Sequence, residues 1–231
     1  MLTRKNSIAI LGCCPLLLTI YEAITWRSAK LFVLIAGTAS LAVMLAWAFR
    51  GGQQLTAAVK GFLSCSGMFC VVVLGCLLLL LLVCSLAGYL PYSDRPGPGW
   101  GTPNVPSWEE IRFYAAWELM NVPAFFFWGT ILFAFAAFLG WLRTPLWLVR
   151  LIAGLLCGLS SLLLTAAAGW YIALGVFVTN AGGIFGLLFG VFVLPKFATE
   201  TGIQLPLWLR CVAISVASLA MATAILYPLF R

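Results

Sequence analysis

Few side chains in this chain could carry out acid–base or nucleophilic chemistry, because its 231 residues include no histidine. Histidine is the side chain that most often transfers protons near neutral pH and that holds haem b in membrane bundles. Without it, the common histidine-containing zinc sites and the Ser-His-Asp and Cys-His nucleophile systems are excluded. The sequence also contains no GxGxxG motif and no phosphate-binding P-loop. We therefore expect no catalytic residue, no metal site, no haem and no enzymatic activity of the chain by itself, although it could serve as a subunit of an enzyme complex.

The eight cysteines do not form a metal-binding or redox motif. All lie in or beside apolar tracts and no CxxC pair occurs, so neither a thioredoxin-like pair nor a zinc ribbon is indicated. We interpret those on the third apolar tract as small apolar side chains that fill gaps between helices. These are Cys65, Cys70, Cys76 and Cys84.

Six polar residues stand beside or within apolar tracts and are the candidate ligand-binding residues. Polar groups are costly near lipid, so those that occur there often have a function. They are Glu22, Arg112, Glu118, Asn121, Thr179 and Asn180. We hypothesise that they surround a polar pocket that opens on the outer side of the membrane. The alternative, which is more common for any single polar residue, is that each one bonds a neighbouring helix or lies in the interface.

Glycines recur every fourth residue in two of the apolar tracts. They are Gly154 and Gly158 in one tract, and Gly182, Gly186 and Gly190 in the next. Small residues at this spacing lie on one helix face and allow two helix backbones to approach closely. We expect them to pack helices within the chain, in preference to forming an oligomer interface.

The elements that must position these residues are set by the distribution of charge. The chain is 64% hydrophobic and 8% charged, and its charged residues fall in clusters that long uncharged tracts separate. A soluble protein this apolar could not cover its surface, so the solvent of these tracts must be lipid. The sequence predicts one all-α, polytopic transmembrane bundle of about seven spans. These are residues 7–25, 31–49, 62–90, 123–142, 146–168, 171–194 and 207–229.

The basic residues indicate the orientation of this bundle. With a cytoplasmic N-terminus, eight basic residues lie inside and five outside, while five of the six acidic residues lie outside. Basic residues accumulate on the cytoplasmic side of membrane proteins. The sequence therefore predicts that the N-terminus is cytoplasmic and the C-terminus is outside. The inner set is Arg4, Lys5, Arg50, Lys60, Arg143, Arg150, Lys196 and Arg210.

Two segments near the middle of the chain complete the description. Residues 91–107 are rich in proline and glycine and predict an outer loop without helix. The capping-box pattern that starts at Ser107 predicts a short interfacial helix over residues 108–120. In the following span, we expect the aromatic run from Phe125 to Trp128 to face lipid or the membrane interface. The alternative is an aromatic wall for an apolar ligand.

These features favour a non-enzymatic integral membrane subunit or anchor of a larger membrane complex. A haem-free quinone or lipid site near the outer face, with Glu118 and Asn121 beside the ligand, is compatible with it, and quinone is the one cofactor considered. The alternative is a small transporter or channel for a neutral solute that uses the outward-facing pocket.

The expected partners are the lipid bilayer and other membrane or peripheral subunits. Nucleic acid is not among them, because the basic residues form no stripe with interleaved aromatic residues. The expected location is the inner (plasma) membrane of the cell.

Overall fold

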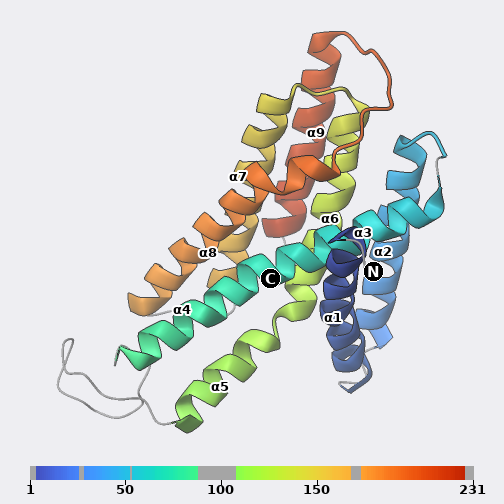
Figure 1. Cartoon of the computed structure of the whole chain (residues 1–231). Helices are drawn as coiled ribbons and strands as arrows, with labels where there is room; N and C mark the ends of the chain where they lie inside the picture. The colour runs from blue at the N-terminus through green and yellow to red at the C-terminus, as the bar shows by residue number, and fades with distance from the viewer. Residues whose placement is uncertain (1–3, 26–28, 53, 88–107, 168–172, 227–231) are drawn as a thin grey trace.

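The computed structural model of the protein describes residues 4–25, 29–52, 54–87, 108–167 and 173–226 (Figure 1). Every regular element within these residues is a helix. The elements are α1 (Arg4–Thr25), α2 (Ala29–Phe49), α3 (Leu55–Phe69), η1 (a π-helical turn, Cys70–Leu74), α4 (Gly75–Leu86), α5 (Trp108–Leu119), α6 (Val122–Trp141), α7 (Leu146–Ala167), α8 (Ala173–Phe192), η2 (a 3₁₀ turn, Leu194–Phe197) and α9 (Leu207–Leu226). The expected outer loop at residues 91–107 and the expected boundary between the spans 146–168 and 171–194 fall outside the described residues.

Among the described residues, five helices are long and apolar enough to cross a membrane. They span Ile8–Thr25, Phe32–Phe49, Leu55–Cys84, Val122–Trp141 and Leu146–Ala167. Two further apolar helices, Thr179–Phe192 and Leu207–Thr223, are shorter over the described residues. A helix needs about 20 apolar residues to cross the hydrocarbon core. The prediction of an all-α, multi-pass membrane bundle is confirmed at this level.

The third rod of the bundle is longer than its apolar tract. Its helix begins at Leu55, although the uncharged tract begins only after Lys60. A lysine does not end a helix at a membrane boundary, because its aliphatic stem lies along the helix while the ammonium group reaches water. The rod then continues without a break through η1 into α4. The π-helical turn therefore lies inside a membrane-spanning helix.

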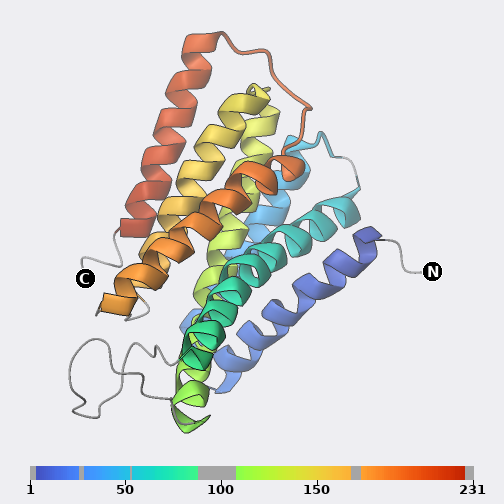
Figure 2. The same ribbon diagram turned by 60° about the vertical axis from the view of Figure 1, so that its left-hand side comes forward.

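Successive rods run in alternating directions, as Figures 1 and 2 show from two sides. The ends of α2, α6 and α8 and the starts of α3, α7 and α9 consequently lie in the upper part of both views. The α5–α6 junction, the end of α4 and the start of α8 lie in the lower part. This arrangement collects residues that are distant in sequence at two opposite ends of the bundle.

Helix α6 is the centre of the bundle. It packs against α1, α2, α3 and α7, so it is enclosed on most of its circumference. The expectation that Phe125–Trp128 face lipid is wrong for most of this run, since Phe125, Phe126 and Trp128 are buried. Phe126 meets Phe62 edge to face with ring centroids 5.7 Å apart. The cause of the error is that an aromatic residue serves the lipid interface and a helix interface equally well, and the sequence pattern does not tell which neighbours enclose a helix.

Candidate functional site

The six polar candidates lie on three helical rods at the lower end of the bundle or near it. Glu22 is in the last turn of α1, Arg112 and Glu118 are on α5, Asn121 is at the α5–α6 junction, and Thr179 and Asn180 are on α8. Arg112 and Asn180 are exposed, whereas Glu22, Asn121 and Thr179 are half-buried. The side chain of Glu118 lies outside what the structure describes.

The helices that carry these residues have different main neighbours. Helix α1 packs on α3, α6 and α2, whereas α8 packs on α7, α4 and the turns η1 and η2. Helix α5 packs on α4. The packing thus places α4 between the helix of Arg112 and the helix of Asn180. A common pocket for all six residues stays a prediction.

The predicted glycine positions lie between α7 and α8, which form the most extensive helix pair of the structure. A Cβ atom at Gly190 would lie 2.2 Å from the carbonyl oxygen of Ala153, and one at Gly186 would lie 2.3 Å from that of Cys157. At Gly158 a Cβ atom would lie 3.2 Å from the Cβ atom of Leu187, which is a tight contact but not an overlap. Only glycine fits at Gly186 and Gly190, so these two residues bring the two backbones together within one chain.

Hydroxyl groups inside the bundle mostly bond their own helix. Thr19 donates to the carbonyl oxygen of Pro15 at 2.7 Å and Thr130 to that of Phe126 at 2.9 Å. Thr165 donates to the carbonyl oxygen of Ser161 at 2.6 Å. Such bonds from residue i to the carbonyl of residue i−4 satisfy a hydroxyl locally. These groups are consequently not directed at a ligand.

Two buried hydroxyls that the structure describes are exceptions, since neither Ser161 Oγ nor Thr144 Oγ1 has a hydrogen-bond partner there. The Ser161 side chain points at Gly186, because a Cβ atom there would lie 2.2 Å from Ser161 Oγ. The atom is thus closed in by the α7–α8 contact and is not open to a ligand.

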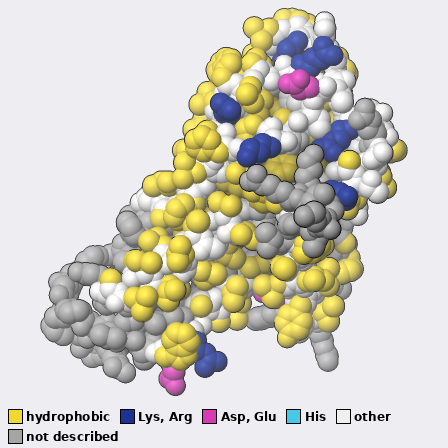
Figure 3. Space-filling view, in the orientation of Figure 1, with side chains coloured by type: hydrophobic (Ala, Val, Ile, Leu, Met, Phe, Trp, Pro, Cys, Tyr) yellow, Lys and Arg dark blue, Asp and Glu magenta, His cyan; other side chains and the backbone are white. Residues whose placement is uncertain are grey.

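Cations gather at the upper end of the bundle, opposite the polar candidates. Figure 3 shows Lys and Arg side chains over this end, with one acidic side chain among them. The structure brings together residues from three inter-helix turns, α2–α3, α6–α7 and α8–α9, and from the adjoining helix ends. They are Arg50, Lys60, Arg143, Arg150, Lys196 and Arg210, together with Glu200. We call this set the basic end.

The end of α2 fixes the position of Arg50. The amide of Gly52 donates to the carbonyl oxygen of Trp47 at 3.2 Å, and the amide of Gly51 donates to that of Ala48 at 3.0 Å. This pair of bonds is the Schellman motif, which needs a left-handed residue directly after the helix. Gly51 has φ 66° and Gly52 has φ 78°, values that glycine adopts without strain. Arg50 is therefore the cap residue directly after Phe49, the last residue of α2.

The Arg50 guanidinium is held against α3. A Cβ atom on Gly61 would lie 3.5 Å from Arg50 Nη2, so the missing side chain of Gly61 leaves space beside the guanidinium. Arg50 Nε is buried and has no hydrogen-bond partner among the described residues. Burial penalises the charged form and lowers the pKa of Arg50. The basic end thus contains a half-buried cation whose charge no described residue compensates.

The segment after η2 closes this end of the bundle. Residues 198–206, which we call the strap, run from η2 to α9 (Figure 1). Thr201 donates its hydroxyl to the carbonyl oxygen of Phe49, and Thr199 donates to that of Ala137 at 3.4 Å. Gly140 permits this approach, because a Cβ atom there would lie 2.1 Å from the amide nitrogen of Thr199. The strap therefore ties the last turns of α2 and α6 together.

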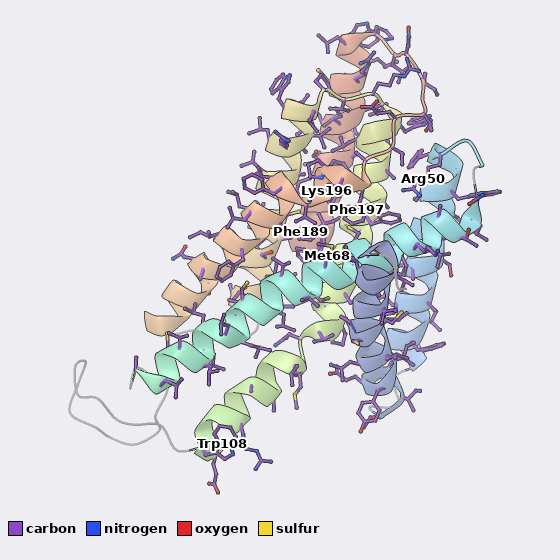
Figure 4. The ribbon with its side chains drawn as sticks, viewed as in Figure 1. Arg50, Met68, Trp108, Phe189, Lys196 and Phe197 are labelled. Atoms are coloured by element: carbon purple, nitrogen blue, oxygen red, sulfur yellow. The ribbon has the colours of Figure 1, made fainter. Side chains whose placement is uncertain are left out.

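Two of the arginines at the basic end belong to this structural framework. Arg210 Nε donates to the carbonyl oxygen of Leu205 at 2.7 Å, and its Nη1 donates to that of Arg143 at 3.3 Å. Lys60 and Lys196 are exposed. Figure 4 shows Arg50 and Lys196 on the same face of this end, with Phe197 between them in that view.

In the sequence, Arg50 serves only as a topology signal. The sequence Arg50-Gly51-Gly52 directly after an apolar tract does predict a glycine helix end. Such an end marks the preceding arginine as the cap residue of the helix. The space beside Gly61 and the lack of an anionic neighbour depend on helix packing and could not be read from the sequence.

Comparison with known proteins finds no family model, no curated protein and no solved structure that matches this chain.

Proposed function

We propose that the protein is a non-enzymatic integral membrane subunit or anchor that works within a larger membrane complex. The observation that carries this proposal is the filling of the bundle interior. Large side chains such as Phe69, Phe126 and Phe133 are fully buried around α6, and most buried hydroxyls bond their own helices. A closely packed interior with satisfied polar groups suits a scaffold better than a conduit or a catalytic cavity.

The proposed topology has seven spans, with α8 and α9 as the last two. The extensive α7–α8 contact supports α8 as a span, since its partner α7 is long and apolar enough to cross the membrane. The collection of cations at one end of the bundle supports a cytoplasmic N-terminus and an outside C-terminus. The plasma membrane is the proposed location.

The proposed partners are membrane or peripheral subunits that contact the outer side. The sequence of residues 91–107, rich in proline and with a tryptophan, is suited to docking such a subunit. A haem-free quinone or lipid site near Glu118 and Asn121 is part of this proposal. Protein mass available for other contacts is small, because most of the chain is within the apolar helices.

Purification from native membranes in a mild detergent tests the subunit proposal. We expect other membrane or peripheral proteins to co-purify in a fixed ratio with the full chain, and quantitative mass spectrometry of the purified particle measures that ratio. A chain that is isolated alone as a stable monomer or homodimer would contradict the proposal.

A transporter or channel for a neutral solute is the second candidate, and the π-helical turn η1 favours it. Such turns inside helices occur frequently at functional sites. In proteoliposomes placed in external glycerol, so that the glycerol gradient is directed inward, this candidate predicts protein-dependent swelling that Glu118→Gln or Asn180→Ala reduces. Equal swelling of the two variants and the original chain would remove the outward pocket from consideration.

A further inference from the structure

The Arg50 guanidinium is a charged donor group held ready without an acceptor. Its Nε atom is closed off, but the side chain as a whole is only half-buried, so the terminal nitrogens remain open. The glycine turn after α2 and the space beside Gly61 fix where the group lies. A charge that is partly removed from water and unpaired is costly, and an anion at the open side would offset this cost.

The chemistry of this position selects a phosphate group. A guanidinium presents planar, paired N–H donors that match two phosphate oxygens, and it stays charged at every physiological pH. Lys60, one residue before Gly61, adds a second exposed cation on the adjoining turn of α3. Arg210 is less suited to a ligand, because its guanidinium already donates to the backbone carbonyl oxygens of Leu205 and Arg143.

The surroundings of Arg50 favour a lipid phosphate over a free one. Arg50 directly follows the apolar stretch Phe32–Phe49 of α2, and the next helix that is long and apolar enough to cross a membrane begins at Leu55. Trp47 is 41% exposed and Val59 is 37% exposed on these same helices. Such surfaces lie in contact with acyl chains at the depth where phospholipid headgroups begin. A single ligand with a phosphate group and apolar chains would satisfy both the guanidinium and the apolar surface beside it.

We propose that Arg50, assisted by Lys60, binds the phosphate of an anionic phospholipid in the leaflet at the basic end of the bundle. The fork of Arg50 holds the phosphate oxygens, Lys60 adds attraction for the net negative charge, and the acyl chains lie along the exposed apolar side chains near Trp47 and Val59. The site requires no movement of the strap, which contacts α2 through the carbonyl oxygen of Phe49.

Fluorescence quenching by brominated lipid tests this proposal on the full chain. The protein is reconstituted in vesicles that mix phosphatidylcholine and phosphatidylglycerol, with bromine on one lipid or the other. We expect phosphatidylglycerol to be preferred about tenfold at one class of site, the scale of one charge-assisted pair. Trp47→Phe should remove most of the preferential quenching, because Trp47 lies three residues before Arg50 and is exposed.

Arg50→Gln should abolish the preference, whereas Arg150→Gln should leave it within about twofold. Arg150 is an exposed cation at the same end but on α7, so it controls for the general field of the basic end. Equal losses in the two variants, or no preference in the original chain, would overturn the proposal. Quenching that persists in Trp47→Phe would also overturn it, because the lipid would then lie elsewhere.

One further variant and one competition measurement complete the test. Arg50→Lys keeps the charge but lacks the planar fork, so we expect its preference for phosphatidylglycerol to fall to about threefold. This variant tests the site if Arg50→Gln does not fold. Inorganic phosphate added to the buffer should not displace the lipid. Displacement by inorganic phosphate at concentrations similar to those of the lipid would assign the site to a free anion and overturn the lipid assignment.

Discussion

At the scale of single residues, position decides more than residue type. Arg50 and Arg210 are both arginines at the basic end, yet Arg210 bonds two backbone carbonyl groups while the guanidinium of Arg50 has no described acceptor. Ser160 and Ser161 differ in the same way. Ser160 donates to the carbonyl oxygen of Leu156, whereas Ser161 Oγ is buried without a partner.

Ser161→Ala should stabilise the protein by about 1 kcal/mol, because it removes a buried hydroxyl that has lost water and gained no partner. Ser160→Ala should instead destabilise it by about 0.5 kcal/mol, the typical value for a hydrogen bond inside a membrane protein. Thermal unfolding in one detergent, followed by tryptophan fluorescence, measures both. If Ser161→Ala lowers the midpoint as much as Ser160→Ala does, the hydroxyl of Ser161 has a partner.

At the scale of elements, the helix ends of the basic end share one geometry with different residues. Helix α6 ends as α2 does. The amide of Arg143 donates to the carbonyl oxygen of Gly140 at 2.9 Å, and the amide of Thr144 donates to that of Leu139 at 3.1 Å. The left-handed position is occupied by Gly51 after α2 but by Arg143, with φ 52°, after α6. A side chain at this position costs about 1 kcal/mol or more.

Arg143→Gly should therefore raise the free energy of unfolding by about 1 kcal/mol, and Gly51→Ala should lower it by a similar amount. Nothing lies within 4 Å of a Cβ atom at Gly51, so the second change reports backbone strain alone. Denaturation of the two variants in the same detergent gives the comparison. The same sign for both changes would contradict the shared helix-end geometry.

The α7–α8 pair makes a second prediction about elements. Gly190→Ala should destabilise the chain by about 3 kcal/mol, since its Cβ atom would overlap the carbonyl oxygen of Ala153 and force the helices apart. Gly37→Ala in α2 is the matched control, because nothing lies within 4 Å of its Cβ atom and alanine favours a helix. Equal thermal midpoints for Gly190→Ala and the original chain would show that α7 and α8 separate without loss of stability.

At the scale of the whole molecule, the alternating rods separate two chemical environments. One end carries the basic residues and the strap, and the other carries Glu22, Asn121 and the start of α8. The interior between them is filled by the aromatic residues around α6. This division supports a scaffold that has distinct contacts on the two sides of the membrane.

The proposed topology predicts which side each end faces. Alkaline phosphatase fused after Arg231 should be active in bacterial cells, and the same enzyme fused after Gly52 should be inactive, because it folds only outside the cytoplasm. Green fluorescent protein fused at the same two points should give the opposite pattern. An active phosphatase after Gly52 would show that the basic end faces the outside, which would contradict the proposed orientation.

The sequence by itself determined the solvent of the chain and the approximate course of its helices. Uncharged tracts are a one-dimensional property, and a tract long enough to cross the hydrocarbon core must satisfy its backbone internally by forming a helix. The spacing of Gly182, Gly186 and Gly190 likewise indicated a helix contact, because residues four apart share one face. Their partner surface on α7 became visible only in the structure.

Only the tertiary structure decided which faces are enclosed. The run Phe125–Trp128 looked suited to lipid but is mostly buried, because α6 has helices on several sides. Arg50 looked like a topology signal but lies against Gly61 without a described anion, because α2 and α3 meet there and the strap bonds the end of α2. Burial and charge compensation arise from neighbours that are distant in sequence, so no local pattern contains them.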